Sequence, residues 1–476
     1  MEKITCKGVN FTYPDSDRKA LDNISFTVSE GEFCLLTGES AAGKSTLLRL
    51  LKSEIAPVGE LSGEIKAYGK TGYVFQNVEE SIVCDKVRSE LSFGLTNMGL
   101  SGEKIELAVA EIASYFNIEK LLNSSISELS GGEKQLVNLA SVMVMKPEIL
   151  LLDEPCSQLD PVSAEHFLNL VKKLQTDFNI TVIISEHSSE EVFDFADSLL
   201  LLDNGRLVIK AKREEAINYI LENDLKIKEA IPIKYTLKGF DIKPYIPCDE
   251  KSSEAVRVKN IWYAYNKGED VLKGAKFTAY KGKINAIIGA NGSGKTTLLK
   301  TIAGVCKSYR GNINADGKLS MLTQNVYDLF TQERCGDEVN FGETTDFLGI
   351  SEIENRHPYD ISGGQAQRLA IAKLLERNAD IIILDEPTRG LDALLKIRLS
   401  DLLKRLCESG KTVILASHDI EFVGAYCNYV SFLSDGIIIT SQPRREFFSA
   451  LSFYTTYVAR KTNGKAVSLN DLERKQ

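Results

Sequence analysis

The chain has 476 residues, of which 43% are apolar and 26% charged, proportions typical of soluble globular proteins. Its formal net charge of −9 excludes a generic nucleic-acid coat, since such proteins bind phosphates mainly through basic residues, and we expect no nucleic-acid partner. No apolar run is long enough for a membrane-spanning helix, and residues 1–11 carry no apolar signal segment. We therefore expect the protein to reach a membrane only through a partner. Nine cysteines without CxxC pairs favour reduced thiols over disulfides or zinc.

Short apolar strands alternate with helical stretches along each half of the chain. The first strand, at residues 33–37, leads into a glycine-rich loop and a helix that begins at Lys44. Strands separated by helices predict an α/β fold with a mainly parallel sheet, in which ligands bind at the C-terminal ends of the strands. A further helix is predicted at residues 213–222. The other predicted strands, in chain order, span residues 149–152, 181–185, 284–288, 381–384 and 412–417.

The second half of the chain repeats the first. Gln76 matches Gln324, and Ser130 matches Ser362, in the same order along each half. The segment that joins the glutamine to the serine is shorter in the second copy, where it spans 324–362, than in the first, where it spans 76–130. The second copy has therefore been trimmed between its glutamine and its Ser-Gly-Gly segment. A period this long indicates two whole domains rather than a solenoid.

The repeat defines the expected domain boundaries. We expect a first domain at residues 1–235, a linker at residues 236–254 and a second domain at residues 255–476. The linker contains prolines and ends in a charged run. The polar tail after Gly464 is expected to be mobile.

Each half carries the pattern Gly-x-x-x-x-Gly-Lys-Ser/Thr, the P-loop, between a predicted strand and a predicted helix. Backbone N–H groups of such a loop cradle phosphates, the lysine reaches the β- and γ-phosphates, and the hydroxyl of Ser45 or Thr296 binds Mg²⁺. The predicted phosphate-binding residues are Gly38, Glu39, Ser40, Ala41, Ala42, Gly43, Lys44, Ser45 and Thr46 in the first copy, and Gly289, Ala290, Asn291, Gly292, Ser293, Gly294, Lys295, Thr296 and Thr297 in the second.

One position of the first P-loop departs from the second. Ala41 stands where the second copy has Gly292. If this position requires a positive φ, alanine is strained there. We then expect weaker nucleotide binding at the first loop.

An Asp-Glu-Pro sequence ends one predicted strand in each copy. Asp153 and Asp385 can hold Mg²⁺ directly or through water. Glu154 and Glu386 are the candidates to orient or deprotonate an attacking water molecule. An acidic pair at a strand end is common by itself, but its recurrence beside a P-loop favours the catalytic interpretation.

Ser130 and Ser362 each open a Ser-x-x-Glu or Ser-x-x-Gln sequence before a helical apolar pattern. On spacing alone, this pattern predicts a capping box. The intervening glycine pairs, Gly131-Gly132 and Gly363-Gly364, also expose backbone N–H groups. Anion binding at these helix starts is therefore an alternative to plain capping.

Taken together, both copies resemble the nucleotide-binding domain of ABC transporters. The resemblance rests on the P-loops, the two glutamines, the Ser-Gly-Gly segments, the Asp-Glu-Pro sequences and two downstream histidines. It implies that the two domains pair head to tail within the chain and clamp each ATP, with Mg²⁺, between the P-loop of one copy and the Ser-Gly-Gly segment of the other. The first site would join Lys44, Asp153, Glu154 and His187 with Ser362, Gly363 and Gly364, and the second would join Lys295, Asp385, Glu386 and His418 with Ser130, Gly131 and Gly132.

The resemblance implies roles for four further residues. Tyr13 and Tyr265 precede the P-loops and would stack on adenine, although a strand aromatic in the core is the plain alternative. Asp160 and Asp392 match the loop that links the two ATP sites in the family.

The histidines and glutamines complete the implied sites. His187 and His418 would contact the γ-phosphate and help to position the attacking water. Gln76 and Gln324 would contribute to binding of the nucleotide and Mg²⁺. The first copy has Glu186 directly before its histidine, where the family usually has Ser or Thr. We therefore expect the first site to turn over differently from the second.

The segment after each glutamine resembles the ATP-binding subunits of energy-coupling-factor (ECF) importers, which take up vitamins or transition-metal ions. The similar residues are 76–83 and 87–94 in the first copy and 324–330 and 337–342 in the second. This resemblance implies a motor at the cytoplasmic face of a membrane, beneath a transmembrane coupling protein and a small substrate-binding membrane protein. The trimming of the second copy falls in the helical subdomain that docks such a partner, so the second docking surface would be smaller.

Two other functions stay open. The paired ATPase of a sugar-type importer is also tandem, but that group departs from these motifs in its second half, whereas both halves are complete here. Soluble tandem ABC proteins that act on ribosomes or DNA form the third group. Those on ribosomes usually carry a long charged helical linker, whereas residues 211–254 are interrupted by prolines. The sequence favours the ECF-type motor.

Overall fold

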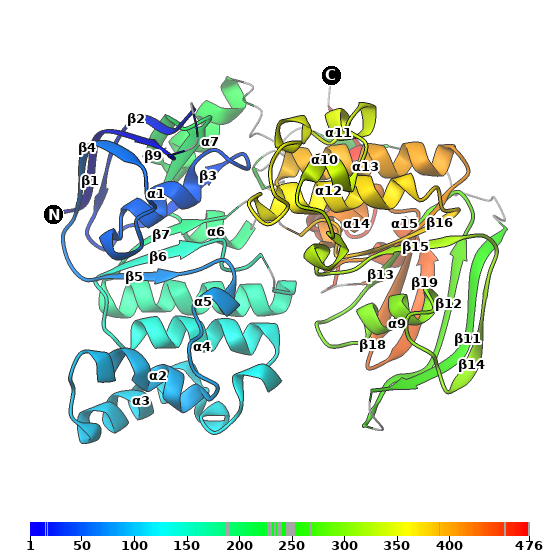
Figure 1. The fold of residues 1–476 in the computed structure, drawn as a ribbon, viewed down its shortest axis with the longest axis horizontal. Helices are drawn as coiled ribbons and strands as arrows, with labels where there is room; N and C mark the ends of the chain where they lie inside the picture. Colours follow the sequence, from blue (N-terminus) through cyan, green and yellow to red (C-terminus); the bar gives the residue numbers. More distant parts are fainter. Residues whose placement is uncertain are drawn as a thin grey trace. The chain divides into compact units, whose positions relative to one another are not determined.

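A computed structural model provides the structure of the chain, which divides into two compact units, Met1–Pro232 and Ile233–Gln476 (Figure 1). The structure describes residues 1–14, 16, 18–157, 159–186, 190–223, 225, 231–232, 235, 240–243, 253–265, 268–389, 391–451 and 454–474.

The first unit contains a six-stranded sheet in the order β5-β6-β7-β3-β8-β9. Its first five strands are parallel, and the sixth pairs antiparallel with β8. The central strands are buried along their whole length, which is why they read as continuous apolar runs. The predicted α/β fold is thus confirmed. The strands are β3 (Phe33–Gly38), β5 (Thr71–Val74), β6 (Ile149–Asp153), β7 (Thr181–Ser185), β8 (Ser198–Asp203) and β9 (Arg206–Lys212).

A smaller antiparallel sheet, in the order β2-β1-β4, covers the helix that follows the first P-loop. Leu47 of this helix packs in one apolar core with Ile4 of the small sheet and Leu36 of the large sheet. The P-loop is therefore fixed between two sheets. The small sheet comprises β1 (Glu2–Thr12), β2 (Lys19–Ser29) and β4 (Glu60–Ala67).

The helices of the first unit include a separate helical region, in which α2 and α3 lie away from the small sheet (Figure 1). The helix predicted at residues 213–222 is confirmed as α7. The helices are α1 (Lys44–Leu50), α2 (Val87–Asn97), α3 (Gly102–Phe116), α4 (Gly131–Met143), α5 (Pro161–Phe178), α6 (Glu190–Phe195) and α7 (Arg213–Glu222). Within the described residues of both units, the short 3₁₀ helices are η1 (Ser53–Ile55), η2 (Val78–Glu80), η3 (Glu119–Leu121), η4 (Ile126–Glu128), η6 (Val326–Leu329), η7 (Ser351–Ile353) and η8 (Leu469–Asp471).

The second unit repeats both sheets, in the orders β15-β16-β17-β13-β18-β19 and β12-β11-β14. Its P-loop helix packs between them as in the first unit, since Leu298 shares a core with Val256 and Ile287. The strands are β11 (Glu254–Ala264), β12 (Asp270–Tyr280), β13 (Ile284–Ile288), β14 (Arg310–Ala315), β15 (Leu319–Leu322), β16 (Ile381–Asp385), β17 (Thr412–Ala416), β18 (Tyr429–Ser434) and β19 (Ile437–Pro443). The helices are α9 (Lys295–Ile302), α10 (Cys335–Glu338), α11 (Glu343–Phe347), α12 (Gly363–Glu376), α13 (Ala393–Glu408), α14 (Ile420–Tyr426), α15 (Arg444–Ser449) and α16 (Tyr457–Lys461).

The trimming of the second copy shortens its helical region. In the first unit α2 and α3 have 11 and 15 residues, whereas α10 and α11 have 4 and 5. The rest of the second unit keeps the strand order of the first. The loss therefore changes a peripheral helical layer and leaves the sheet intact.

The C-terminal tail is packed rather than mobile, so that prediction is wrong. Ala466 and Val467 are fully buried, and the carboxylate of Asp471 accepts hydrogen bonds from the N–H of Val467 (2.8 Å) and from Arg444 (3.0 Å). Polar tail residues thus satisfy buried groups instead of facing water. Strand β20 (Leu472–Arg474) pairs antiparallel with β10 (Phe240–Ile242), which falls in the predicted linker. Most other residues of that linker lie outside the described part of the chain.

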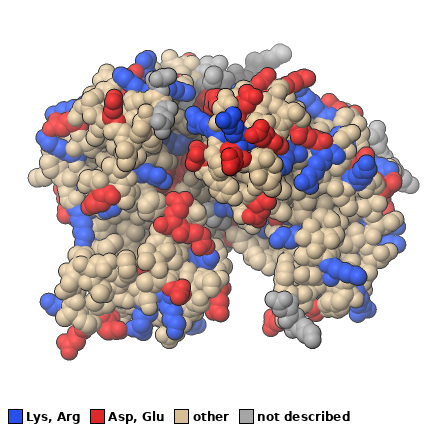
Figure 2. Space-filling model, viewed as in Figure 1, with Lys and Arg blue, Asp and Glu red and all other residues tan. Residues whose placement is uncertain are grey.

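The surface carries charges of both signs. On the face that Figure 2 shows, Lys and Arg side chains are interspersed with Asp and Glu in both units. Within the described residues, no helix is both long enough and apolar enough to cross a membrane.

Candidate functional site

The P-loop of each unit joins the end of a buried strand to the start of a helix. In the first unit, Lys44 opens α1, and its ammonium donates to the carbonyl oxygens of Gly38 (2.9 Å) and Glu39 (3.0 Å). Lys295 repeats both contacts in the second unit, at 2.8 and 3.0 Å. Each buried lysine therefore lies across the loop, beside a helix N-terminus whose N–H groups favour anions. The geometry is that of a phosphate cradle.

Ala41 adopts a positive φ of 63°, as the equivalent Gly292 does at 77°. The condition for strain at Ala41 is therefore confirmed. A Cβ atom added to Gly292 would meet no heavy atom within 4 Å, so the penalty at this position comes from the backbone conformation and not from crowding. Weaker nucleotide binding at the first loop stays a prediction.

Asp153 lies at the end of β6, 3% exposed, and three hydroxyl groups donate to its carboxylate. Ser45 (3.0 Å) and Ser185 (2.8 Å) donate to Oδ1, and Tyr73 (2.9 Å) donates to Oδ2. Burial raises the pKa of Asp153, and the charge of Glu154 acts in the same direction, whereas these hydroxyls lower it. The predicted neighbours Ser45 and Asp153 are thus in contact.

Asp385, the equivalent residue, is 1% exposed, and neither of its carboxylate oxygens has a hydrogen-bond partner among the described residues. The strand register places Ala416 opposite Asp385, where Ser185 stands opposite Asp153. Met321 occupies the strand position of Tyr73. Burial raises the pKa of Asp385 to about 6, although the neighbouring Thr296 hydroxyl acts in the opposite direction. A buried carboxylate without donors is costly, and the same oxygens fit a divalent cation.

Glu154 has a φ of 45°, a conformation that is strained for a residue with a Cβ atom and is found preferentially at functional sites. Its N–H donates to both the carbonyl oxygen (3.1 Å) and the hydroxyl (3.0 Å) of Ser185. Its Oε2 atom accepts a hydrogen bond of 2.7 Å from Gln76. The structure thus brings the predicted base and the predicted glutamine together.

Glu386 repeats the positive φ, at 51°, but a different side chain holds it. The Nδ1 atom of His418 lies 2.8 Å from its Oε2 atom. Burial alone would lower the pKa of His418, but the charge and hydrogen bond of Glu386 outweigh it, and the pKa is raised. Gln324 is exposed, and the equivalent histidine of the first copy, His187, lies outside the described residues.

Ser130 and Ser362 are N-caps with complete capping boxes, so the predicted capping boxes are confirmed. The N–H of Ser130 donates to Glu133 (2.9 Å), and that of Ser362 donates to Gln365 (3.0 Å). The adjacent Gly131 and Gly363 are exposed. Anion binding at these helix starts, and the pairing of each with the other unit's P-loop, stay predictions.

Tyr13 and Tyr265 are 38% and 45% exposed, so the core alternative is wrong for both. Their hydroxyls lie 3.0 Å from Thr46 and 3.2 Å from Thr297, in the P-loop helices. Each ring also packs edge-on against a strand aromatic two residues earlier. The tyrosines are therefore held beside the loops with ring surface free to contact a flat ligand.

Asp160 and Asp392 are the N-caps of α5 and α13, a role that the sequence reasoning missed. Asp160 accepts hydrogen bonds from the N–H groups of Val162 and Ser163, both at 3.1 Å, and Asp392 accepts one from Leu395 at 2.8 Å. The signal was present, because an aspartate directly before a helical pattern predicts a cap. Tyr73 and Ser185 were also missed, since their contacts with Asp153 join separate strands.

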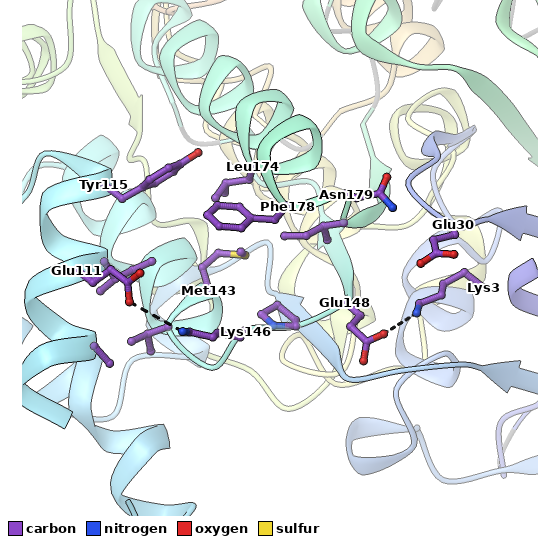
Figure 3. Close-up of a pocket in the computed structure, with 15 residues that line it drawn as sticks. Lys3, Glu30, Glu111, Tyr115, Met143, Lys146, Glu148, Leu174, Phe178 and Asn179 are labelled. Carbon is purple, nitrogen blue, oxygen red and sulfur yellow. Dashed lines mark hydrogen bonds and ion pairs between the residues drawn. The ribbon is translucent and has the colours of Figure 1, made fainter. Parts of the chain in front are cut away.

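A cavity of about 410 Å³ in the first unit lies apart from these residues (Figure 3). Its apolar lining includes Met143, Leu174 and Phe178, and two ion pairs, Lys3–Glu148 (2.6 Å) and Lys146–Glu111 (3.9 Å), stand at its sides. Glu148 directly precedes β6, whereas the P-loop follows the C-terminal end of β3, two strands away in the same parallel sheet. The cavity therefore lies at the N-terminal ends of the parallel strands, and the P-loop lies at their C-terminal ends.

Comparisons with known proteins agree with this geometry. The profile of the ABC transporter family matches residues 21–157 and 272–389, more than half of the chain. An ABC transporter ATP-binding protein of Bacillus anthracis is 34% identical over 95% of this chain and 94% of its own length. Another, from Methanosarcina mazei, is 32% identical over 93% of this chain and 89% of its own length.

Solved structures share the fold. An archaeal ribosome recycling factor, crystallised with a ribosomal stalk protein, matches with a TM-score of 0.68 over 93% of this chain and 91% of that chain, at 22% identity. An RNase-L inhibitor matches with a TM-score of 0.66 over 94% of this chain and 92% of that chain, at 21% identity. At such low identity, the similarity to these two structures shows a shared fold and nothing further.

Proposed function

The chain belongs to the ABC transporter family of ATP-binding, ATP-hydrolysing proteins, and from this premise we propose that it is the motor of an ECF-type importer. The proposed cargo is a vitamin or a transition-metal ion, carried by separate membrane subunits. The observation that carries the proposal is the segment after each predicted glutamine, where a buried glutamate fixes a loop, together with the exposed apolar side chains that follow this loop in the first unit.

The loop after Gln76 is held from within the first unit. The buried Oε2 atom of Glu90 accepts hydrogen bonds from the N–H groups of Val83 (3.0 Å) and Cys84 (2.8 Å). Glu338 makes the equivalent contacts with the N–H groups of Thr331 and Gln332 in the second unit. A loop fixed in this way presents a defined surface, because its backbone N–H groups are satisfied internally.

Apolar side chains are exposed around the loop of the first unit. Val83, Phe93 and Met98 are 65%, 41% and 51% exposed, and all three lie between Gln76 and α3. Contiguous patches of exposed apolar side chains are typical of protein contact sites, and these three residues fall within one short segment of the chain. This segment supports the docking of a helix from an apolar membrane subunit.

We propose the following division of labour for ATP hydrolysis. Lys44 and Lys295 bind the phosphates, and Glu154 and Glu386 accept a proton from the attacking water. Gln76 and His418 orient the two glutamates through the hydrogen bonds described above. Asp153 and Asp385, with the hydroxyls of Ser45 and Thr296, would hold Mg²⁺, which when bound neutralises charge on the phosphates.

Two ATP sites are proposed to form within one chain. Each would combine the P-loop of one unit with the Ser-Gly-Gly segment of the other. The exposed glycines at the start of α4 and α12 support this arrangement, since their N–H groups are open to a ligand. The protein would then act at the cytoplasmic face of the membrane, held there by its partner.

A tagged pull-down from gently solubilised membranes tests the transport function. We expect a stoichiometric, very apolar membrane subunit and a small substrate-binding membrane protein to co-purify. Phe93→Asp should reduce their recovery, whereas Val58→Asp, at an equally apolar site that is 82% exposed before β4, should not. ATP binding by both variants serves as the folding control.

Recovery only from the soluble fraction, with ribosomal or DNA-repair proteins attached, would contradict the importer function. A soluble ABC protein that acts on ribosomes or DNA would then be favoured. Co-purification of the permease pair of a sugar importer would instead favour the paired ATPase of a sugar-type importer. Neither result would alter the ATPase chemistry.

A further inference from the structure

We propose that the two ATP sites bind their divalent cation with unequal affinity, and that Tyr73 and Ser185 set the difference by occupying the carboxylate of Asp153. The inference rests on the proposed roles of Asp153 and Asp385 as cation ligands. It goes beyond them because it assigns a function to two residues outside the family motifs. The first site is expected to be the weaker one.

The two carboxylates differ in partners but hardly in burial. Both end the same central strand of their sheet and are 3% and 1% exposed. Three hydroxyls donate to Asp153, whereas Asp385 has the Thr296 hydroxyl as a neighbour but accepts no well-formed hydrogen bond within the described part of the chain. The difference therefore comes from neighbouring side chains and not from depth in the protein.

Two of the three donors are specific to the first copy. Tyr73 lies on β5 and Ser185 ends β7, the strands on either side of β6. Their counterparts in the second unit, Met321 and Ala416, have no hydroxyl group. The third donor, Ser45, is matched by Thr296, which also bears a hydroxyl.

The sign of the effect follows from the cost of burying a carboxylate. A buried anion without hydrogen bonds carries an uncompensated desolvation penalty, which a bound cation relieves. At Asp153 the hydroxyls have already relieved part of this penalty and occupy lone pairs that a cation or its water would use. A cation therefore gains less at Asp153 than at Asp385.

The opposite outcome is physically reasonable, which makes the proposal testable. Hydroxyl donors could instead strengthen cation binding by holding the carboxylate in a fixed orientation. The two effects predict opposite signs for a variant that removes only a hydroxyl group. Tyr73→Phe is such a variant, because it keeps the ring that packs against Phe75.

The experiment measures Mn²⁺ binding by electron paramagnetic resonance, in the full chain with a non-hydrolysable ATP analogue. We expect two classes of bound Mn²⁺, with dissociation constants that differ by roughly tenfold or more, since one hydrogen bond of ordinary strength accounts for about tenfold and two hydroxyls differ between the sites. Lys44→Ala should remove mainly the weaker class and Lys295→Ala mainly the tighter class. Tyr73→Phe and Ser185→Ala should each tighten the weaker class.

The reverse substitution provides an independent check in the other unit. Ala416→Ser should weaken the tighter class of Mn²⁺ by a similar factor, and it remains informative if a change at Tyr73 disturbs folding. Equal affinities in the wild type, or weaker Mn²⁺ binding in Tyr73→Phe, would overturn the inference. Failure of the chain to bind the ATP analogue at all would instead contradict the proposed ATP sites themselves.

Discussion

In the first unit the buried carboxylate of Glu90 is held by two backbone N–H groups, whereas in the second the equivalent Glu338 also pairs with Lys373. Ser141 stands at the position of that lysine in the first copy. The reverse holds at the strand ends, where Asp153 has more donors than Asp385. Equivalent buried charges are thus stabilised by different partners in the two units.

This comparison shows which features of a duplicated domain are fixed. The strand order, the lysine contacts within both P-loops and the positive φ of both catalytic glutamates recur unchanged. The side chains that satisfy buried carboxylates do not. Backbone geometry that many contacts determine together is retained, whereas a single hydrogen bond can be replaced at a cost of about 1 kcal/mol.

The largest expected effect is the loss of ATP turnover when the two catalytic glutamates are replaced. Substituting Glu154→Gln and Glu386→Gln together should lower ATP turnover by roughly 10²–10⁴-fold, because no general base remains at either site. Of the single variants, Glu386→Gln should cost more, since its copy has the regular Ser417-His418-Asp419 sequence. Steady-state phosphate release measures turnover, and retained binding of labelled ATP is the control. Undiminished hydrolysis in the double variant would refute the assignment.

The next largest effect is expected for the Lys373–Glu338 ion pair of the second unit, which has no counterpart at Glu90 among the described residues. Lys373→Met leaves the fully buried side chain of Glu338 without its cation and should destabilise the second unit by about 3 kcal/mol. Trp262, the sole tryptophan, lies on β11 and reports on this unit alone, so its fluorescence in urea measures the change. Lys134→Met breaks the exposed Lys134–Glu79 pair of the first unit and should leave this transition in place.

A smaller effect concerns the backbone of the two P-loops. Gly292→Ala should destabilise the second unit by about 1 kcal/mol, because alanine is disfavoured at a φ of 77°. Ala41→Gly should stabilise the first unit by a similar amount and tighten ATP binding there. Urea unfolding and titration with labelled ATP, in Lys44→Ala and Lys295→Ala backgrounds, measure these effects. Equal residual affinities in the two backgrounds would contradict weaker binding at the first loop.

The smallest expected effect is a pH dependence of the second unit. The pKa of His418 is raised above its ordinary value of 6.5, so the stability that its contact with Glu386 contributes is complete below about pH 6.5 and is lost as the pH rises through the folded-state pKa. Trp262 fluorescence in urea between pH 6 and pH 9 measures this decline. His418→Gln should flatten it. An unchanged slope in that variant would exclude the histidine as its source.

Features that depend on local sequence were predictable. Strands β7 and β13 have the predicted bounds, since their apolar runs are short and stop at Ser185 and before Gly289. Both capping boxes and α7 were also predicted from the spacing of a few residues. In each case the residues that determine the structure are adjacent in the chain.

Features that depend on tertiary contacts were not predictable in the same way. The hydroxyl of Tyr73 reaches Asp153 across 80 positions of sequence, and strand pairing alone brings them together. The packed tail was missed because its composition is polar, although Asp471 and Arg444 satisfy each other inside the fold. A polar side chain is predicted to be exposed only when no hydrogen-bond or ion-pair partner is available inside the fold.

The pairing of β10 with β20 closes the second unit into a loop of chain, because one strand comes from its beginning and the other from its end. The polypeptide thus enters and leaves this unit at adjacent strands, about 5 Å apart. Under mechanical tension applied to the C-terminus, this three-residue pairing of β10 with β20 would bear the force before the main sheet does. A circular permutation of the second unit that joins these two strands therefore needs only a short connection.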